Sequence, residues 1–203
     1  LCLHRCRMEP PYARNCGAAA VLCLSGLLRT GKLCAKPERR GKAMSREIVA
    51  ALEEPYQRSW ALLAQYMDIC PENIWAETNG GWPVWQQVAH AIAVLNFFIL
   101  ESDDETFLPA PAGIGVLMLK EQGKDVVSKE AMQAYGKSVK AAVDARLAAL
   151  SNADLTRVQE RVSKKIGRDL TYAAMIAMLA SHTTYHLGSC DAALRDHGLP
   201  GVF

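Results

Sequence analysis

Two histidines four residues apart are the residues whose types and spacing point most directly to chemistry. His182 and His186 follow an apolar stretch and precede Gly198 and Pro200, a pattern typical of a helix that ends near residue 197. On a helix, this spacing places both side chains on one face, about 40° apart in rotation and about 6 Å apart along the axis. Two neutral imidazoles held in this way can bind one transition-metal ion if another element supplies a further ligand.

His90 is the candidate for that further ligand. It lies in the segment 83–100, which is apolar nearly all round and therefore predicts a buried helix, and its two neighbours are alanines that leave room beside the ring. The alternative is a neutral core histidine that hydrogen-bonds across the bundle, with the i,i+4 pair a coincidence. The three histidines together favour the hypothesis that His90, His182 and His186 hold one metal ion.

Other metal-binding helices fit this sequence less well. A His-Glu-x-x-His metalloprotease helix needs a glutamate where position 183 is Thr. A di-iron bundle needs Glu-x-x-His, but residues 87, 179 and 183 are Gln, Leu and Thr. A bis-histidine haem site stays open, although two histidines on one helix suit a single ion better. Cys190 is either a fourth ligand or a small core residue, and His197 is expected to interact with the last helix carbonyls.

The elements that must position these residues are helices. Ser45 is predicted to cap a first helix that ends before Pro71, and Pro55 is expected to divide or kink it. Turn residues at 79–81 precede the second helix, which Pro83 begins. The third helix runs from Ser128 to about residue 150, and the fourth contains the histidine pair.

The remaining segments connect these helices. Ser151 and Asp154 resemble a capping box, which predicts a short helix over about 153–164. Residues 101–127 form a long connection that is expected to cross the bundle or cover a site. No segment predicts a convincing strand. The predicted fold is therefore an all-α four-helix bundle with a long connection between helices two and three, spanning residues 44–203.

Charge and cysteine are unevenly distributed along the 203 residues. Residues 1–43 contain nine Lys and Arg but two acidic residues, and five of the seven cysteines, whereas the rest is mildly acidic. No basic face suited to nucleic acid is evident, and no apolar run approaches a membrane span of about 18 residues. Only Cys70 and Cys190 lie outside the first segment, which is no disulfide framework and favours a reducing, cytoplasmic location.

Residues 1–43 are expected to be an N-terminal extension that is disordered or not native, with Met44 as the natural start. A targeting sequence is an alternative, because residues 18–28 form a short apolar stretch behind Arg14. A zinc site is a weaker one, because these cysteines lack the short paired spacing of zinc fingers.

At this point the motifs carry a resemblance. One motif is Trp82-x-x-Trp85, which precedes the histidine of the second helix. The other is His-x-x-x-His-x-Gly in the last helix, followed by Leu-Arg and Gly-Leu-Pro. With these motifs the chain resembles the DinB family of metal-binding four-helix bundles over about 44–203. The resemblance implies that His90, His182 and His186 bind zinc or nickel, and that the protein is a homodimer. Ser189-Cys190 departs from the usual continuation of the family motif.

The resemblance also suggests an activity, because the family includes enzymes that transfer low-molecular-weight thiols. Three nitrogen ligands would leave a metal position open to a water or a thiol. We expect a metal-dependent thiol S-transferase acting on a small molecule, with a metal-dependent hydrolase or a non-catalytic metal- or ligand-binding bundle as alternatives. No carboxylate near the pair suggests a general base, so no catalytic residue is named beyond the metal site.

Overall fold

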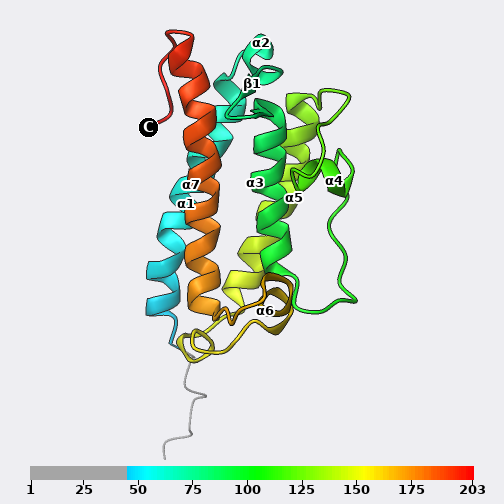
Figure 1. Ribbon diagram of the computed structural model, residues 1–203. Coiled ribbons are helices and arrows are strands. Elements are labelled where there is room, and N and C mark those ends of the chain that lie inside the picture. Colours follow the sequence, from blue (N-terminus) through cyan, green and yellow to red (C-terminus); the bar gives the residue numbers. More distant parts are fainter. Residues whose placement is uncertain (1–44) are drawn as a thin grey trace, which may run out of the picture. The chain divides into compact units, whose positions relative to one another are not determined.

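Four long helices form the body of the described chain, residues 45–203, in the computed structural model (Figure 1). They are α1 (Glu47–Ile69), α3 (Val84–Ile99), α5 (Lys129–Ala148) and α7 (Tyr172–Asp196). The connections contain the shorter α2 (Glu72–Trp75), α4 (Ile114–Leu117) and α6 (Glu160–Ile166), and the 3₁₀ turn η1 (Asn152–Asp154). The prediction of an all-α bundle is confirmed, whereas the expectations for residues 1–43 concern a part of the chain outside the described residues.

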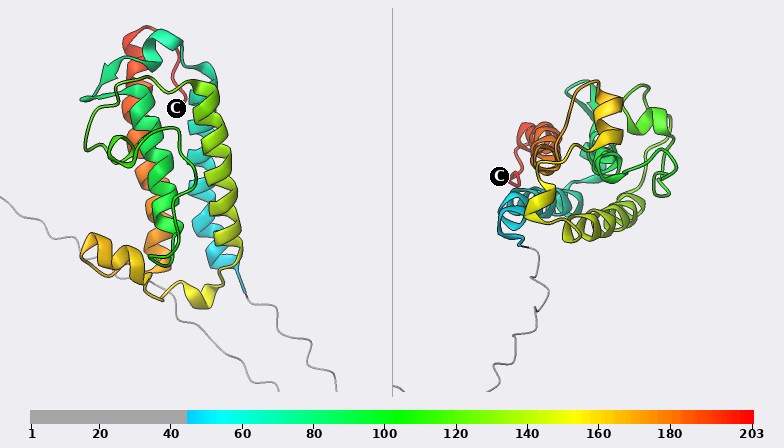
Figure 2. Two further views of the ribbon diagram at one scale, coloured as in Figure 1. Left: turned by 90° about the vertical axis from the view of Figure 1, so that its right-hand side faces the viewer. Right: turned by 90° about the horizontal axis from the view of Figure 1, so that it is seen from below.

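The directions in which the four long helices run explain the long connection between α3 and α5. α1 and α7 run one way along the bundle while α3 and α5 run the other way (Figures 1 and 2). The chain leaving α3 must therefore return along the whole bundle before α5 can begin. Residues 100–128 make this return, and α4 lies within them, beside α3 (Figure 1).

The core lies among the four helices, with α7 packed against α1 and α3, and α5 packed against α3 and α1 (Figure 2). α3 is the most enclosed: all its residues except His90 and Phe97 are buried. This matches the apolar character of α3 on every side. Buried aromatic side chains fill part of the core, and each contributes on the order of 2 kcal/mol through burial; they include Tyr56, Tyr66, Trp75 and Trp85.

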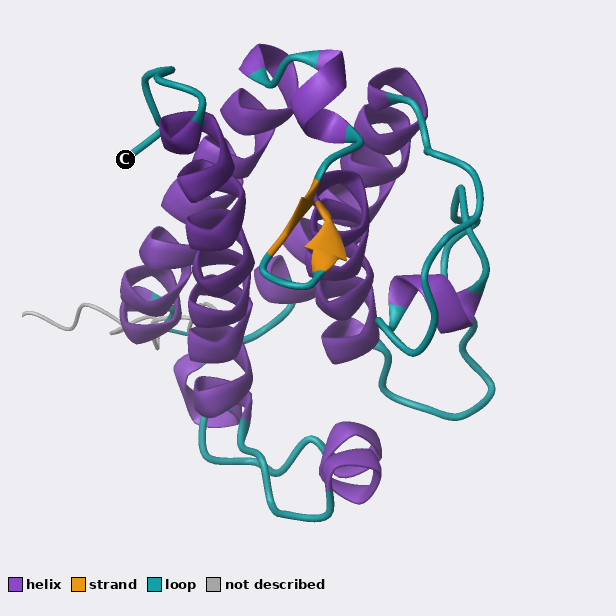
Figure 3. Cartoon of the chain, turned by 45° about the horizontal axis from the view of Figure 1, so that its top comes forward, coloured by secondary structure: helices purple, strands orange, loops and turns teal. Residues whose placement is uncertain are grey.

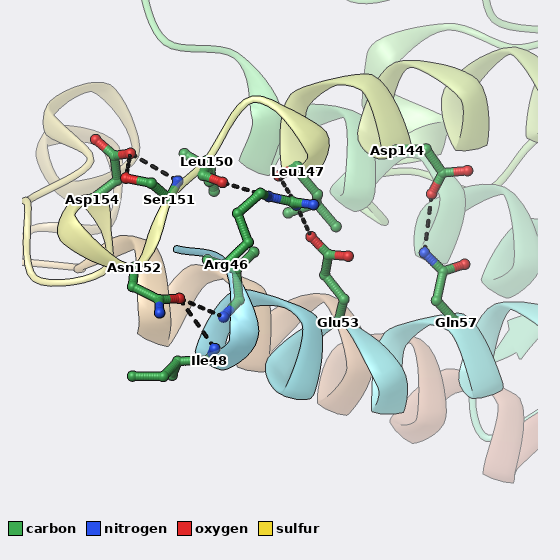
Figure 4. A network of polar contacts seen from close by, with 11 residues as sticks. Arg46, Ile48, Glu53, Gln57, Asp144, Leu147, Leu150, Ser151, Asn152 and Asp154 are labelled. Atoms are coloured by element: carbon green, nitrogen blue, oxygen red, sulfur yellow. Dashed lines mark hydrogen bonds and ion pairs between the residues drawn. The ribbon is translucent and has the colours of Figure 1, made fainter. Parts of the chain in front are cut away.

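The start of α1 is capped by a distant residue. Ser45 was predicted to be the N-cap, but Arg46 holds that position and its side chain makes no cap bond. Instead the Asn152 carboxamide oxygen accepts from the backbone N–H groups of Ile48 and Val49 at 3.1 and 3.2 Å (Figure 4). The sequence prediction was wrong because the capping side chain comes from η1, far along the chain.

Arg46 completes the joint in the opposite direction. Its guanidinium donates to the carbonyls of Leu147 and Leu150 at the end of α5, at 2.8 and 2.7 Å, and pairs with Glu53 (Figure 4). A cation at a helix C-terminus satisfies free carbonyls and complements the helix dipole. Arg46 at the beginning of α1 therefore caps the end of α5, and Asn152 of η1, just beyond α5, caps α1.

Two further expectations need correction. Pro55 was expected to divide or kink α1, and the division is wrong because the helix continues through Pro55. Both Pro55 and Ala51, whose carbonyl the proline cannot bond, are exposed to water. The capping box of Ser151 and Asp154 is present but opens only η1, and α6 begins separately behind Gln159, whose side chain caps it.

The turn at Gly80-Gly81 is tighter than a simple loop. It joins two short antiparallel strands, β1 (Thr78–Asn79) and β2 (Trp82–Pro83), with Asn79 opposite Trp82 (Figure 3). Both glycines have positive φ, 59° and 91°, as a two-residue hairpin requires. The turn was expected, but the strand pairing was not.

Within residues 45–203, no helix combines the length and apolar character needed to cross a membrane.

Two glycines test the local backbone account in opposite directions. Gly167 ends α6 at φ 73°, whereas Gly188 lies inside α7, and an added Cβ would meet nothing within 4 Å at either site. Gly167→Ala should destabilise the protein by about 1 kcal/mol because alanine disfavours the left-handed region. Gly188→Ala should stabilise it by up to about 1 kcal/mol because alanine favours helix. Urea denaturation measures both, and effects of the same sign would contradict this account.

Candidate metal centre

Three imidazole rings from two adjacent helices meet at one point in the bundle. His90 comes from α3, and His182 and His186 come from α7. The ring centroids lie 5.0 Å apart for His90 and His182, and 4.7 Å apart for the other two pairs. One nitrogen from each ring lies within 4.8 Å of the others, which is compact enough for a shared ion. Among residues 45–203, this is the group of His, Cys, Asp or Glu side chains with that property.

Regular helices provide the positions of the rings. α7 is 25 residues long, begins with the Thr171 side chain accepting from the Ala174 N–H, and is followed by Gly198 at φ 71°. Over this length the helical repeat places residues 182 and 186 on one face. Because α3 packs against α7, His90 faces the pair across the helix–helix contact.

A backbone carbonyl orients the His90 ring. The Nδ1 atom of His90 lies 2.7 Å from the carbonyl oxygen of Leu117, at the end of α4. A carbonyl can only accept, so Nδ1 carries the proton and Nε2 keeps its lone pair. Metal-ligating histidines commonly donate their other N–H in this way. The long connection therefore contributes to the centre, as expected for a segment that covers a site, but sequence reasoning missed the carbonyl.

The other two rings contain polar atoms without partners. Nδ1 of His182 and Nδ1 of His186 are both buried and have no hydrogen-bond partner. Leaving a polar atom buried and unpaired costs about 1–3 kcal/mol. Rings in this condition can use a nitrogen for a metal ion without breaking an existing bond, so the donor set fits a transition metal.

Burial keeps all three rings neutral. Desolvation lowers the pKa of His90 below its usual value, despite the bond to the Leu117 carbonyl. Burial, and secondarily the repulsion that a second proton would meet beside the His90 ring, lowers the pKa of His182 to about 4. Burial and the two neighbouring rings lower the pKa of His186 to about 3. Neutral imidazole is the form that binds metals, so protons compete little for these nitrogens at neutral pH.

One side of the centre is accessible from solvent. His186 is buried, while His90 and His182 are partly exposed. Tyr185 is 75% exposed, and its ring lies edge-on to His186 with the centroids 5.0 Å apart. An ion held by these nitrogens would therefore keep a position open to a small molecule.

The remaining candidate residues lie outside the centre. Cys190 is fully buried, burial raises the pKa of its thiol, and it does not join the ligand group, so it is a core residue. His197 was expected to interact with the last carbonyls of α7, and its backbone N–H donates to the Leu194 carbonyl at 3.1 Å, while its ring Nε2 lies 2.7 Å from the Glu77 carboxylate. Asp191 pairs with Arg195 at 2.7 Å.

The family comparison covers both helices of the centre. A family model described as the DinB superfamily matches residues 56–190, which include all three histidines. The chain belongs to the DinB superfamily. No curated protein and no solved structure matches it. Membership in the DinB superfamily agrees with the resemblance found in the sequence motifs and with the helical bundle.

The low pKa values of the histidines predict how the stability of the metal-free protein depends on pH. The unfolded chain takes up protons near 6.5, whereas folded His182 and His186 remain neutral down to about 4 and 3. The unfolded state thus binds more protons below about pH 6.5, so stability falls as the pH drops. From about pH 7 to about pH 5 we expect the free energy of unfolding to fall by about 2 kcal/mol, a value that already allows for the partial exposure of the site.

Denaturation of the chelator-treated protein at several pH values measures this loss. The double variant His182→Asn/His186→Asn, which cannot take up these protons, should show a flatter dependence on pH. An equal slope in the double variant would contradict the assignment.

Proposed function

We propose that this DinB-superfamily protein binds one divalent transition-metal ion, zinc or nickel, through His90, His182 and His186, and uses it as a thiol S-transferase. The observation that carries the proposal is the convergence of three neutral rings from α3 and α7 on one point, with ligand nitrogens within 4.8 Å. When bound, such an ion acts as a Lewis acid that lowers the pKa of a water or thiol at its open position.

The chain itself supplies binding, orientation and access. Burial keeps the nitrogens unprotonated, and the Leu117 carbonyl fixes which nitrogen of His90 is free. The partial exposure of His90 and His182 leaves a path for a substrate. The exposed Tyr185 ring beside His186 offers an apolar surface on which a substrate can rest.

The absence of an acid–base partner favours a thiol as the nucleophile. No described Asp or Glu joins the histidine group. Water needs strong activation, whereas a small thiol has an ordinary pKa of about 8.5 and requires little help to ionise. A metal-dependent hydrolase is the second candidate, and a metal ion that only links α3 to α7 is the third.

The location and assembly are part of the same proposal. A cytoplasmic protein fits the two free, buried cysteines of the described chain. A homodimer fits the apolar groove between α1 and α7, which Leu52, Leu62 and Ala180 help to line. Analytical ultracentrifugation distinguishes dimer from monomer.

Metal titration of single variants tests the ligand set. Wild-type protein should bind about one equivalent of Zn²⁺, and His90→Ala, His182→Ala and His186→Ala should each weaken binding by more than about 100-fold, because each removes a ligand. His197→Ala is the matched control, since His197 pairs with Glu77 away from the centre. Isothermal titration calorimetry measures these affinities. Unchanged binding in any of the three ligand variants would remove that residue from the site.

Turnover separates the three candidate functions. Zinc- or nickel-loaded protein should conjugate a low-molecular-weight thiol to an electrophile, and both chelator treatment and His182→Ala should abolish the reaction. Ester hydrolysis without thiol conjugation would favour the hydrolase. Normal metal binding without either reaction, together with a lower melting temperature after chelation, would favour the structural ion.

A further inference from the structure

One buried side chain of α3 fastens the long connection beside the candidate centre. Gln86 has no exposed surface. Its Nε2 donates to the carbonyls of Val116 and Glu121 at 2.9 and 2.7 Å, and its Oε1 accepts from the Gly123 N–H at 3.1 Å. Since two partners are carbonyls and the third is an N–H, only one orientation of the carboxamide satisfies all of them.

The bonds of Gln86 surround the residue that orients His90. Leu117 directly follows Val116, and its carbonyl accepts from His90 Nδ1 at 2.7 Å. α4 has only four residues, which is too short to be stable alone. Leu119 just beyond it has φ 53°, an unfavourable value for a residue with a Cβ. The position of the Leu117 carbonyl therefore depends on contacts with the rest of the fold, namely its own buried side chain and the carboxamide of Gln86.

Two residues of α3, Gln86 and His90, both contact the long connection. Gln86 and His90 are four residues apart on α3 and so lie on the same face. The carboxamide fixes the connection, the connection places the Leu117 carbonyl, and the carbonyl holds the ring. We propose that Gln86 is a positioning residue for His90, selecting the tautomer whose Nε2 is free for a ligand. This inference rests on the proposed metal site for its functional meaning.

Loss of the Gln86 carboxamide should therefore affect His90 through the connection. If the connection shifts, His90 Nδ1–H loses its acceptor, and the tautomer with the proton on Nε2 becomes populated. That tautomer has no lone pair on Nε2. Because partners behind a ligating histidine typically change metal affinity by about 10–100-fold, we expect a loss in that range.

The neighbouring glutamine is a matched control. Gln87 is also buried, and its Nε2 donates to two carbonyls, those of Asn79 and Trp82, at 2.7 and 3.1 Å. These belong to the β1–β2 hairpin, not to the connection that carries Leu117. Gln86→Met and Gln87→Met thus both replace a buried carboxamide that donates to two carbonyls with an apolar side chain of similar size. Only the first should affect His90.

The experiment compares both variants with the wild type in two measurements. ¹⁵N NMR of the metal-free proteins should show the Nδ1–H tautomer of His90 in wild type and Gln87→Met, and a mixture in Gln86→Met. Competition with a chelator should show Zn²⁺ affinity reduced by about 10–100-fold in Gln86→Met and within about threefold of wild type in Gln87→Met. An unchanged tautomer and affinity in Gln86→Met, or equal losses in both variants, would overturn the inference.

The two measurements separate this inference from the proposed function. If wild-type protein binds no zinc, the proposed function fails, while the tautomer in the metal-free protein still tests the role of Gln86. If Gln86→Met does not fold, Gln86→Glu keeps the acceptor for Gly123 and should show the same tautomer mixture. Hydrogen exchange of wild-type protein gives a check without any variant. The Gly123 amide should be protected from exchange, and rapid exchange would contradict the role given to the Gln86 carboxamide.

Discussion

The proposed site depends on one constraint: three imidazoles share a small volume between α3 and α7 only while they are uncharged. Burial provides this condition, since it lowers the pKa of all three rings, and the closeness of the rings lowers those of His182 and His186 further. The same burial leaves Nδ1 of His182 and His186 without partners. A bound transition metal would offset both the crowding of the rings and the unpaired nitrogens. It accepts the lone pairs of neutral nitrogens and holds several rings close together.

The topology of the bundle supplies what the two helices lack. Because α3 and α5 run in the same direction, a long connection has to return along the bundle, and it passes beside α3 (Figure 1). There it offers the Leu117 carbonyl to His90 while the Gln86 carboxamide holds it in place. A segment that the helix directions require therefore also orients His90, a residue of the proposed metal site.

Periodicity was enough to predict the four long helices and the three histidines that meet. The i,i+4 spacing of His182 and His186 implies one face, and the apolar surroundings of His90 imply burial on a neighbouring helix. The carbonyl at Leu117 could not be predicted, because every residue has one and its partner lies 27 residues away. The Asn152 cap on α1 was missed for the same reason, at a separation of 104 residues. Pro55 misled because its effect depends on exposure, which propensity alone does not reveal.

The most direct test of the central claim is X-ray absorption spectroscopy of the protein loaded with one equivalent of zinc. A centre made by His90, His182 and His186 predicts three imidazole nitrogens at about 2.0–2.1 Å, completed by a light atom from solvent, with no sulfur. Fewer than three imidazoles, or a sulfur shell at about 2.3 Å, would contradict the account.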